Sequence, residues 1–181
     1  MIQHKIRKVW FELFIFASIQ LFMDEIILLT DGSYHPQSHI GYGAYLAIYQ
    51  PYTCLNTLKE HVNVRRFENT SSTKLELQTL LWALTEIEPE GAKVIIYTDS
   101  QNIIGLPGRR QRLERNNYLN KKGELIKNHD LYQEFYSITD VLDCDFIKIK
   151  GHKTENAKTE IDKLFTLVDR TSRKALRENR L

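Results

Sequence analysis

The sequence contains few residues that constrain a chain covalently or break its secondary structure. Of its 181 residues, two are cysteines, four are prolines and eight are glycines. Cys54 and Cys144 stand in unrelated contexts, which argues against a structural zinc site and favours a reducing, cytoplasmic compartment. A hydrophobic content of 42% with 27% charged residues is typical of a globular domain and excludes collagen and wholly disordered chains.

The sequence also lacks an uninterrupted apolar run long enough to span a bilayer. An apolar stretch follows the first basic residues, but Glu12 and Gln20 interrupt it, and no small-residue cleavage site follows. We therefore expect residues 1–22 to be a dispensable extension, with Met23 as a candidate true start, and residues 23–181 to form the domain. A helix packed on the domain or lying at a membrane surface, and a targeting signal, are the alternatives.

Charge is unevenly distributed although the net charge is only +2. Residues 105–129 carry seven basic and two acidic side chains, and residues 148–181 carry ten basic and five acidic ones. Two such segments indicate a polyanionic partner. The alternative is that these lysines and arginines only solvate helix faces.

The periodicity of apolar residues predicts an α/β fold with a mixed sheet. Strands are expected over residues 25–30, 41–49, 60–68, 93–98 and 145–150. Helices are expected from a cap at residues 71–73 to Ile87, and over residues 101–106, 131–141 and 158–178. The three early strands are predicted to form an antiparallel meander. The strand–helix–strand order that follows places the fourth strand parallel to the first.

Carboxylates occur where two of the predicted strands end. Asp31 and Asp99 each follow an apolar strand, and Glu76 lies in the first turns of the intervening helix, beside its apolar stripe. Ligands bind at the carboxyl ends of strands in open α/β sheets. Converging carboxylates need a cation, and oxygen ligands suit Mg²⁺ or Mn²⁺; two ions about 4 Å apart would clamp a phosphodiester. The alternative is two ordinary turn-forming aspartates and an exposed glutamate.

Five motifs together resemble the ribonuclease H family, specifically the small bacterial type 1 enzymes. They are Thr30-Asp31-Gly32-Ser33, Gly41-Tyr42-Gly43-Ala44, Ser71-Ser72-Thr73-Lys74-Leu75-Glu76-Leu77, Tyr97-Thr98-Asp99-Ser100-Gln101 and Lys148-Ile149-Lys150-Gly151-His152. Their order and spacing match the family from about residue 25 to about residue 178. The resemblance implies a five-stranded mixed sheet, with its first three strands antiparallel, flanked by helices.

The resemblance also implies endonucleolytic cleavage of the RNA strand of RNA–DNA hybrids, leaving 5′-phosphate and 3′-hydroxyl ends. Asp31, Glu76, Asp99 and a fourth carboxylate would hold two Mg²⁺ ions, with Mn²⁺ able to substitute. His152 is similar to the family's proton shuttle in a mobile loop. We expect Asp169, which has the better local context, to be the fourth carboxylate; the alternative is Asp162, which has the more usual spacing after the histidine. The two lie seven residues apart on one helix, so only one is expected to reach the metals.

The substrate contacts implied by the resemblance surround these carboxylates. The residues expected to contact the hybrid are Gly32, Ser33, Ser72, Thr73, Lys74, Ser100, Arg109 and Arg110. Ser72 and Thr73 stand where the family often has two asparagines at the minor groove. The expected protein is a cytoplasmic monomer that does not bind membranes. The rival hypotheses are a DNA junction resolvase or exonuclease of the same fold, and a hybrid-binding module without catalysis.

Overall fold

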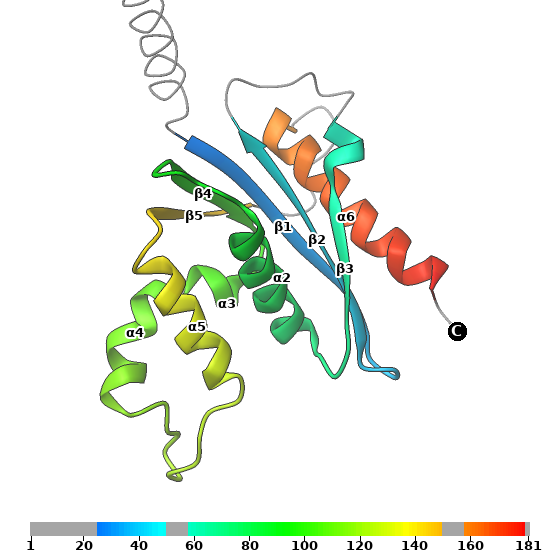
Figure 1. The fold of residues 1–181 in the computed structure, drawn as a ribbon. Coiled ribbons are helices and arrows are strands. Elements are labelled where there is room, and N and C mark those ends of the chain that lie inside the picture. Colours follow the sequence, from blue (N-terminus) through cyan, green and yellow to red (C-terminus); the bar gives the residue numbers. More distant parts are fainter. Residues whose placement is uncertain (1–24, 50–57, 150–157, 180–181) are drawn as a thin grey trace, which may run out of the picture.

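The computed structural model describes residues 25–49, 58–149 and 158–179. Its elements are β1 (Glu25–His35), β2 (Ile40–Tyr49), η1 (Leu58–His61), β3 (Asn63–Phe67), α2 (Ser72–Glu86), β4 (Lys93–Thr98), α3 (Gln101–Ile104), α4 (Leu106–Arg115), α5 (His129–Thr139), β5 (Cys144–Lys148) and α6 (Glu160–Glu178). They are arranged around one twisted sheet (Figure 1). None of the helices in this part of the chain has the length and apolar character that a membrane crossing requires.

The sheet has the order β3-β2-β1-β4-β5 and confirms the predicted mixed topology. β1 pairs antiparallel with β2, and β2 with β3. β4 runs parallel to both β1 and β5. The first strand is longer than predicted, because the polar residues after Thr30 remain paired in the hairpin as far as the pair His35–Ile40. An apolar run marks the buried part of a strand, and this hairpin extends beyond it.

One helix was not indicated by the periodicity. The first part of the basic segment forms α4, and Pro107 lies in its first turn, where a missing backbone N–H costs no hydrogen bond. Leu106 is buried in the core, and its carbonyl accepts a 2.8 Å hydrogen bond from the Tyr136 hydroxyl. The apolar signal was weak because the rest of this short helix is mostly basic and polar.

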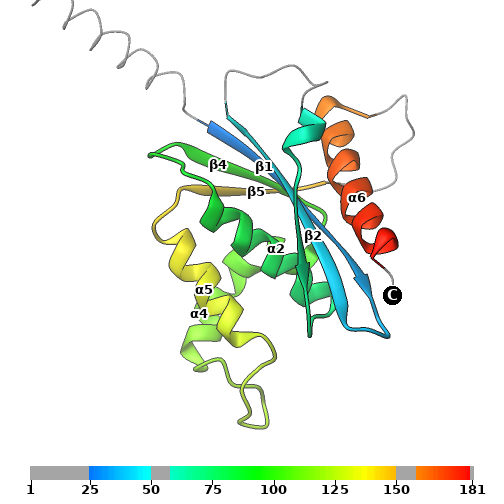
Figure 2. The same ribbon diagram turned by 45° about the vertical axis from the view of Figure 1, so that its right-hand side comes forward.

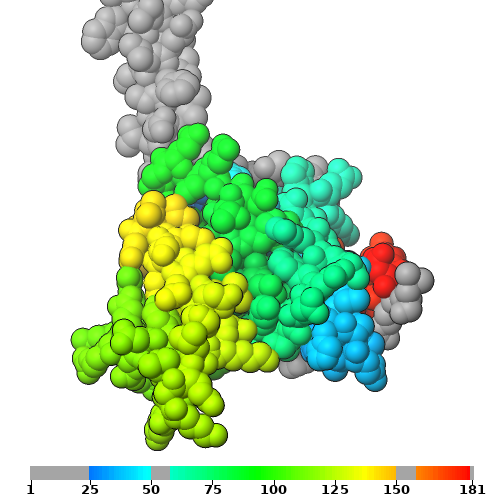
Figure 3. All heavy atoms as spheres, turned by 60° about the horizontal axis from the view of Figure 1, so that its bottom comes forward, coloured from blue at the N-terminus to red at the C-terminus, as the bar shows by residue number. Residues whose placement is uncertain are grey.

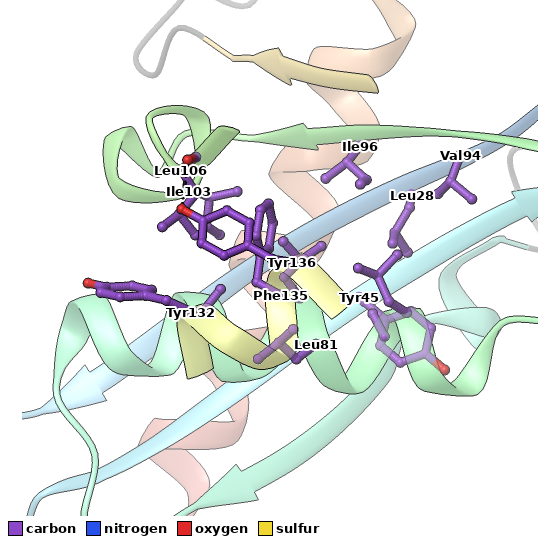
Figure 4. Packing of buried hydrophobic residues seen from close by; sticks show 14 of the residues in the cluster. Leu28, Tyr45, Leu81, Val94, Ile96, Ile103, Leu106, Tyr132, Phe135 and Tyr136 are labelled. Carbon is purple, nitrogen blue, oxygen red and sulfur yellow. Dashed lines mark hydrogen bonds between the residues drawn. The ribbon is translucent and has the colours of Figure 1, made fainter. Parts of the chain in front are cut away.

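Helices cover both faces of the sheet, so β1 is buried on both sides. Figure 2 shows α2, α4 and α5 on one side of the sheet and α6 on the other. Leu28 packs into the α2–α5 layer, whose centre includes Phe135 and Tyr136 (Figure 4). Ile27 and Leu29 pack toward α6. Alternating residues therefore enter two different cores, which explains why the strand is apolar throughout.

Helix α2 lies close to the sheet because glycines face it. A Cβ atom at Gly41 would lie 2.5 Å from Leu75 Cδ2, and one at Gly32 would lie 2.9 Å from the same side chain. At Gly43 an added methyl group would overlap the Thr79 side chain. The missing side chains let the first turns of α2 approach the end of β1. Ser71 caps this helix, as predicted, by accepting a hydrogen bond from the Lys74 N–H.

Candidate active site

The two strand-end aspartates lie at neighbouring positions of the sheet. β1 and β4 are parallel, and Leu29 pairs with Tyr97. Asp31 and Asp99 each lie two residues beyond this pair, Asp31 where β1 continues into the hairpin with β2 and Asp99 directly after the end of β4. Both line one pocket of about 530 Å³. The structure therefore brings together the two aspartates that the sequence motifs singled out.

Two helices contribute the other carboxylates of this pocket. Glu76 comes from the second turn of α2, and Asp169 from the middle of α6 on the opposite face of the sheet. Four carboxylates from four separate segments thus line a common pocket. The remaining lining residues are Gly32, Ser33, Tyr34, Ser72, Arg173, Leu176 and Arg177.

Asp31 has the most perturbed carboxyl group of the pocket. Burial, together with the negative charges of Asp169 and Asp99, raises its pKa from 3.8 to about 7. The Ser172 hydroxyl, which donates a 3.0 Å hydrogen bond to Asp31 Oδ2, and the backbone of Gly32 oppose this rise in pKa. With no cation beside it, the Asp31 carboxyl is therefore poised between its protonated and ionised forms near neutral pH.

Glu76 is held by a second hydroxyl group. Burial raises the pKa of Glu76, the negative charge of Asp99 adds to the rise, and a hydrogen bond from Ser100 opposes it. The Ser100 hydroxyl lies 2.5 Å from Glu76 Oε2 and also accepts from the Ile103 N–H at the start of α3. Ser100 was predicted to contact substrate; in the structure it is buried beneath a carboxylate.

The two candidates for the fourth carboxylate have different surroundings. Asp169 lines the pocket and forms a 2.6 Å ion pair with Arg173, one turn further along α6. Asp162 is buried at the start of the same helix, where its carboxylate accepts hydrogen bonds from the backbone N–H (2.8 Å) and hydroxyl (2.7 Å) of Thr159. This reciprocal capping arrangement accounts for an acidic residue at that position. The geometry thus groups Asp169, and not Asp162, with the other three carboxylates.

The donor set of the pocket suits a hard divalent cation. Its carboxylates supply only oxygen ligands, which Mg²⁺ and Mn²⁺ prefer. A cation would also offset the mutual repulsion that raises the pKa of Asp31. Over the described ranges, however, no three His, Cys, Asp or Glu side chains are clustered tightly enough to hold an ion as they stand. Binding would therefore require some of these side chains to come closer together.

The predicted substrate contacts divide into two groups. Gly32, Ser33 and Ser72 line the pocket beside the carboxylates. Thr73 is exposed at the start of α2, and the Lys74 ammonium donates to the Asn69 carbonyl at 3.3 Å. These two residues therefore lie in the first turn of α2 and do not line the pocket.

The two arginines predicted to grip phosphate have partners within the protein. Arg109 donates to the Asn102 carbonyl (2.6 Å) and side-chain oxygen (2.7 Å), as well as to a backbone carbonyl one turn earlier in the chain. Arg110 forms ion pairs with Glu114 and Asp140. Both belong to α4 and lie outside the pocket lining. Residues 106–139, which form α4, α5 and the segment between them, are called the α4–α5 projection (Figure 1). His152 lies outside the described residues.

Sequence reasoning missed four residues that line the pocket. Tyr34 directly follows the Asp-Gly-Ser motif, and Arg173, Leu176 and Arg177 follow Asp169 at intervals of four, seven and eight residues. Those intervals bring side chains back to one face of a helix. Counting helical turns from Asp169 would therefore have identified Arg173, Leu176 and Arg177 from the sequence.

Comparison with known proteins gives consistent results. A profile described as RNase H matches residues 23–168, ending one residue before Asp169. The chain is 29% identical over 144 residues to a protein named Ribonuclease H from Caldicellulosiruptor saccharolyticus, covering 78% of this chain and 94% of the relative. A Ribonuclease H from Thermoanaerobacter sp. is 27% identical over 146 residues, covering 80% and 89%. A foamy viral protease-reverse transcriptase, solved in complex with dsDNA, shares the fold with a TM-score of 0.57 at 14% identity, covering 83% of this chain and 96% of that one.

Proposed function

Since the chain belongs to the ribonuclease H family, we propose that it hydrolyses the RNA strand of RNA–DNA hybrids endonucleolytically, leaving 5′-phosphate and 3′-hydroxyl ends. Membership of the family makes the protein a nuclease of the ribonuclease H type. The observation that carries the finer proposal is the pocket in which Asp31, Glu76, Asp99 and Asp169 converge from four segments.

We propose that these four carboxylates hold two Mg²⁺ ions, with Mn²⁺ able to substitute. When bound, such ions supply an activated water and stabilise the leaving oxygen of the phosphodiester. Asp31 is the residue best placed to serve both ions, because its carboxyl experiences the negative charges of both Asp169 and Asp99. Glu76 and Asp99 would complete one coordination shell, and Asp169 the other.

Groups around the carboxylates would bind the hybrid without reading its sequence. Ser33 and Ser72 offer hydroxyls at the pocket wall, and Arg173 and Arg177 offer positive charge there. In Figure 3 the α4–α5 projection and the tip of the β1–β2 hairpin lie on opposite sides of α2. Basic side chains of α4 would contact phosphates of the hybrid at a distance from the pocket, which contributes affinity and not specificity.

Three further parts of the proposal come from the sequence. We propose that His152 shuttles a proton during product release, that the protein acts as a monomer, and that it works in the cytoplasm. We also propose that residues 1–22 are dispensable for cleavage, which is supported by a family match that begins at residue 23.

The test is incubation of the full chain with an end-labelled RNA–DNA hybrid, with and without Mg²⁺. We expect internal cuts in the RNA strand only when Mg²⁺ is present, with ends that a 5′-phosphate-dependent exonuclease can digest. The same chain carrying Asp31→Asn is the control for a contaminating nuclease. Preferred cleavage of duplex DNA or of a four-way junction would favour the rival enzymes, and tight hybrid binding without cleavage would favour the binding module.

A further inference from the structure

A serine on α6 contacts the most perturbed carboxylate of the pocket from within the protein. Ser172 is completely buried, and its hydroxyl lies 3.0 Å from Asp31 Oδ2 and 2.9 Å from the backbone carbonyl of Asp169. The first contact joins two segments 141 residues apart in the chain. We propose that Ser172 is a positioning residue that orients the Asp31 carboxylate for a divalent cation, an inference that rests on the proposed function.

The hydrogen bond to Asp31 goes beyond what an ordinary helical hydroxyl does. Thr166 and Thr171, on the same helix, donate to the carbonyls of Asp162 and Leu167, one turn earlier, and so satisfy their hydroxyls locally. Ser172 has the same local option in the Asp169 carbonyl, but it also reaches a carboxylate on another element. Its single proton is shared between the two acceptors, and hydrogen bonds to charged acceptors are the stronger ones.

This hydrogen bond links two of the four carboxylate residues of the pocket. Asp169 lies on α6 one turn before Ser172, so the serine ties the backbone that carries one carboxylate to the side chain of another. With Oδ2 held, the Asp31 carboxylate cannot rotate about its last bond without losing this partner. Groups that hydrogen-bond to metal ligands in this way orient them, and their loss typically weakens metal binding 10-fold to 100-fold.

The test compares Ser172→Ala with Thr171→Ala in the full chain. Both changes remove one hydroxyl from neighbouring positions of α6, but only the first removes a contact with a carboxylate. Binding of Mn²⁺ is measured without substrate from the free-ion electron paramagnetic resonance signal, and the melting temperature is recorded alongside. We expect Ser172→Ala to weaken Mn²⁺ binding about 10-fold or more, and Thr171→Ala to leave it unchanged.

Hybrid cleavage supplies a second readout. At limiting Mg²⁺, Ser172→Ala should lower kcat while the KM for hybrid stays close to the wild-type value, and higher Mg²⁺ should recover much of kcat. Equal or tighter Mn²⁺ binding by Ser172→Ala would overturn the inference, as would a wild type that binds no Mn²⁺. A wild type that binds Mn²⁺ but does not cleave hybrid would refute the proposed function and leave the binding comparison to decide the role of Ser172.

Discussion

Replacing Asp31 with asparagine should stabilise the metal-free protein at neutral pH while abolishing its activity. The pKa of Asp31 rises from 3.8 to about 7, chiefly because the carboxyl is buried. This rise in pKa corresponds to about 4 kcal/mol of preference for the uncharged form in the folded state. Asparagine is uncharged, nearly the same size, and keeps a side-chain oxygen that can accept from Ser172. We therefore expect the variant to gain about 1–3 kcal/mol of stability at pH 8.

The sign of the pH dependence follows from proton binding. Between pH 4 and pH 7 the folded protein holds a proton on Asp31 that the unfolded chain has released. Unfolding then releases protons, so the free energy of unfolding falls as the pH rises through this window. Below pH 4 both states are protonated at this carboxyl, and above about pH 7 both are ionised. The Asp31 contribution to the pH dependence is therefore confined to that window and absent in Asp31→Asn.

Urea unfolding of both proteins in EDTA at pH 5 and pH 8 measures the effect. The free energy of unfolding of the wild type should fall more between the two pH values than that of Asp31→Asn. Added Mg²⁺ should raise the stability of the wild type at pH 8 and leave the variant nearly unaffected. The reasoning that burial and like charges disfavour the ionised form of Asp31 would be refuted by two results together. Asp31→Asn would be less stable than the wild type at pH 8, and the stability of both proteins would change with pH in the same way.

Three further predictions concern packing, the fourth carboxylate and substrate binding. Gly43→Ala should lower the free energy of unfolding, measured in urea, by about 1–3 kcal/mol, because the added methyl group would overlap Thr79. Gly108→Ala is the control: it lies inside α4 with open space around it, and it should raise the free energy of unfolding by about 0.5–1 kcal/mol. Asp169→Asn should lower kcat by orders of magnitude at saturating Mg²⁺. Asp162→Asn should mainly cost about 0.3–1 kcal/mol of stability, because it removes a negative charge near the start of α6; the opposite ranking would identify Asp162 as the ligand. Arg110→Ala should reduce the slope of log affinity against log salt by about 0.9 if this side chain exchanges its carboxylate partners for a phosphate.

Most of the fold could be predicted because each element carries its own periodic signal. Local sequence alone is enough to recognise α2, from its row of apolar residues and the capping Ser71 at its start. The same holds for the apolar strands β1 and β4. The helix α4 could not be recognised in this way, because only Leu106 of its ten residues is fully buried. The extension of β1 to His35 was also hidden, since hairpin pairing, and not burial, keeps those polar residues in a strand.

The candidate site was predictable where a carboxylate directly follows the apolar part of a strand. Parallel pairing of β1 and β4 dictates that Asp31 and Asp99 end at the same edge of the sheet, whatever surrounds them. The local context of Asp169 favoured it over Asp162, but which of the two lines the pocket depends on how far α6 lies along the sheet. The contact between Ser172 and Asp31 could not be predicted for the same reason, because it depends on the register of a helix against a strand far away in sequence.

The partners of the carboxylates suggest how the pocket tolerates its charge before a cation binds. Asp31 and Glu76 each have a hydroxyl donor, in Ser172 and Ser100, and Asp169 has the guanidinium of Arg173. A hydroxyl can keep its bond while another oxygen of the carboxylate binds an ion, so the two serines need not leave. The Arg173 side chain is 60% exposed, and an exposed ion pair is weakly held. Asp169 can therefore exchange its arginine for a metal at little cost, which makes it the carboxylate whose movement would complete the site.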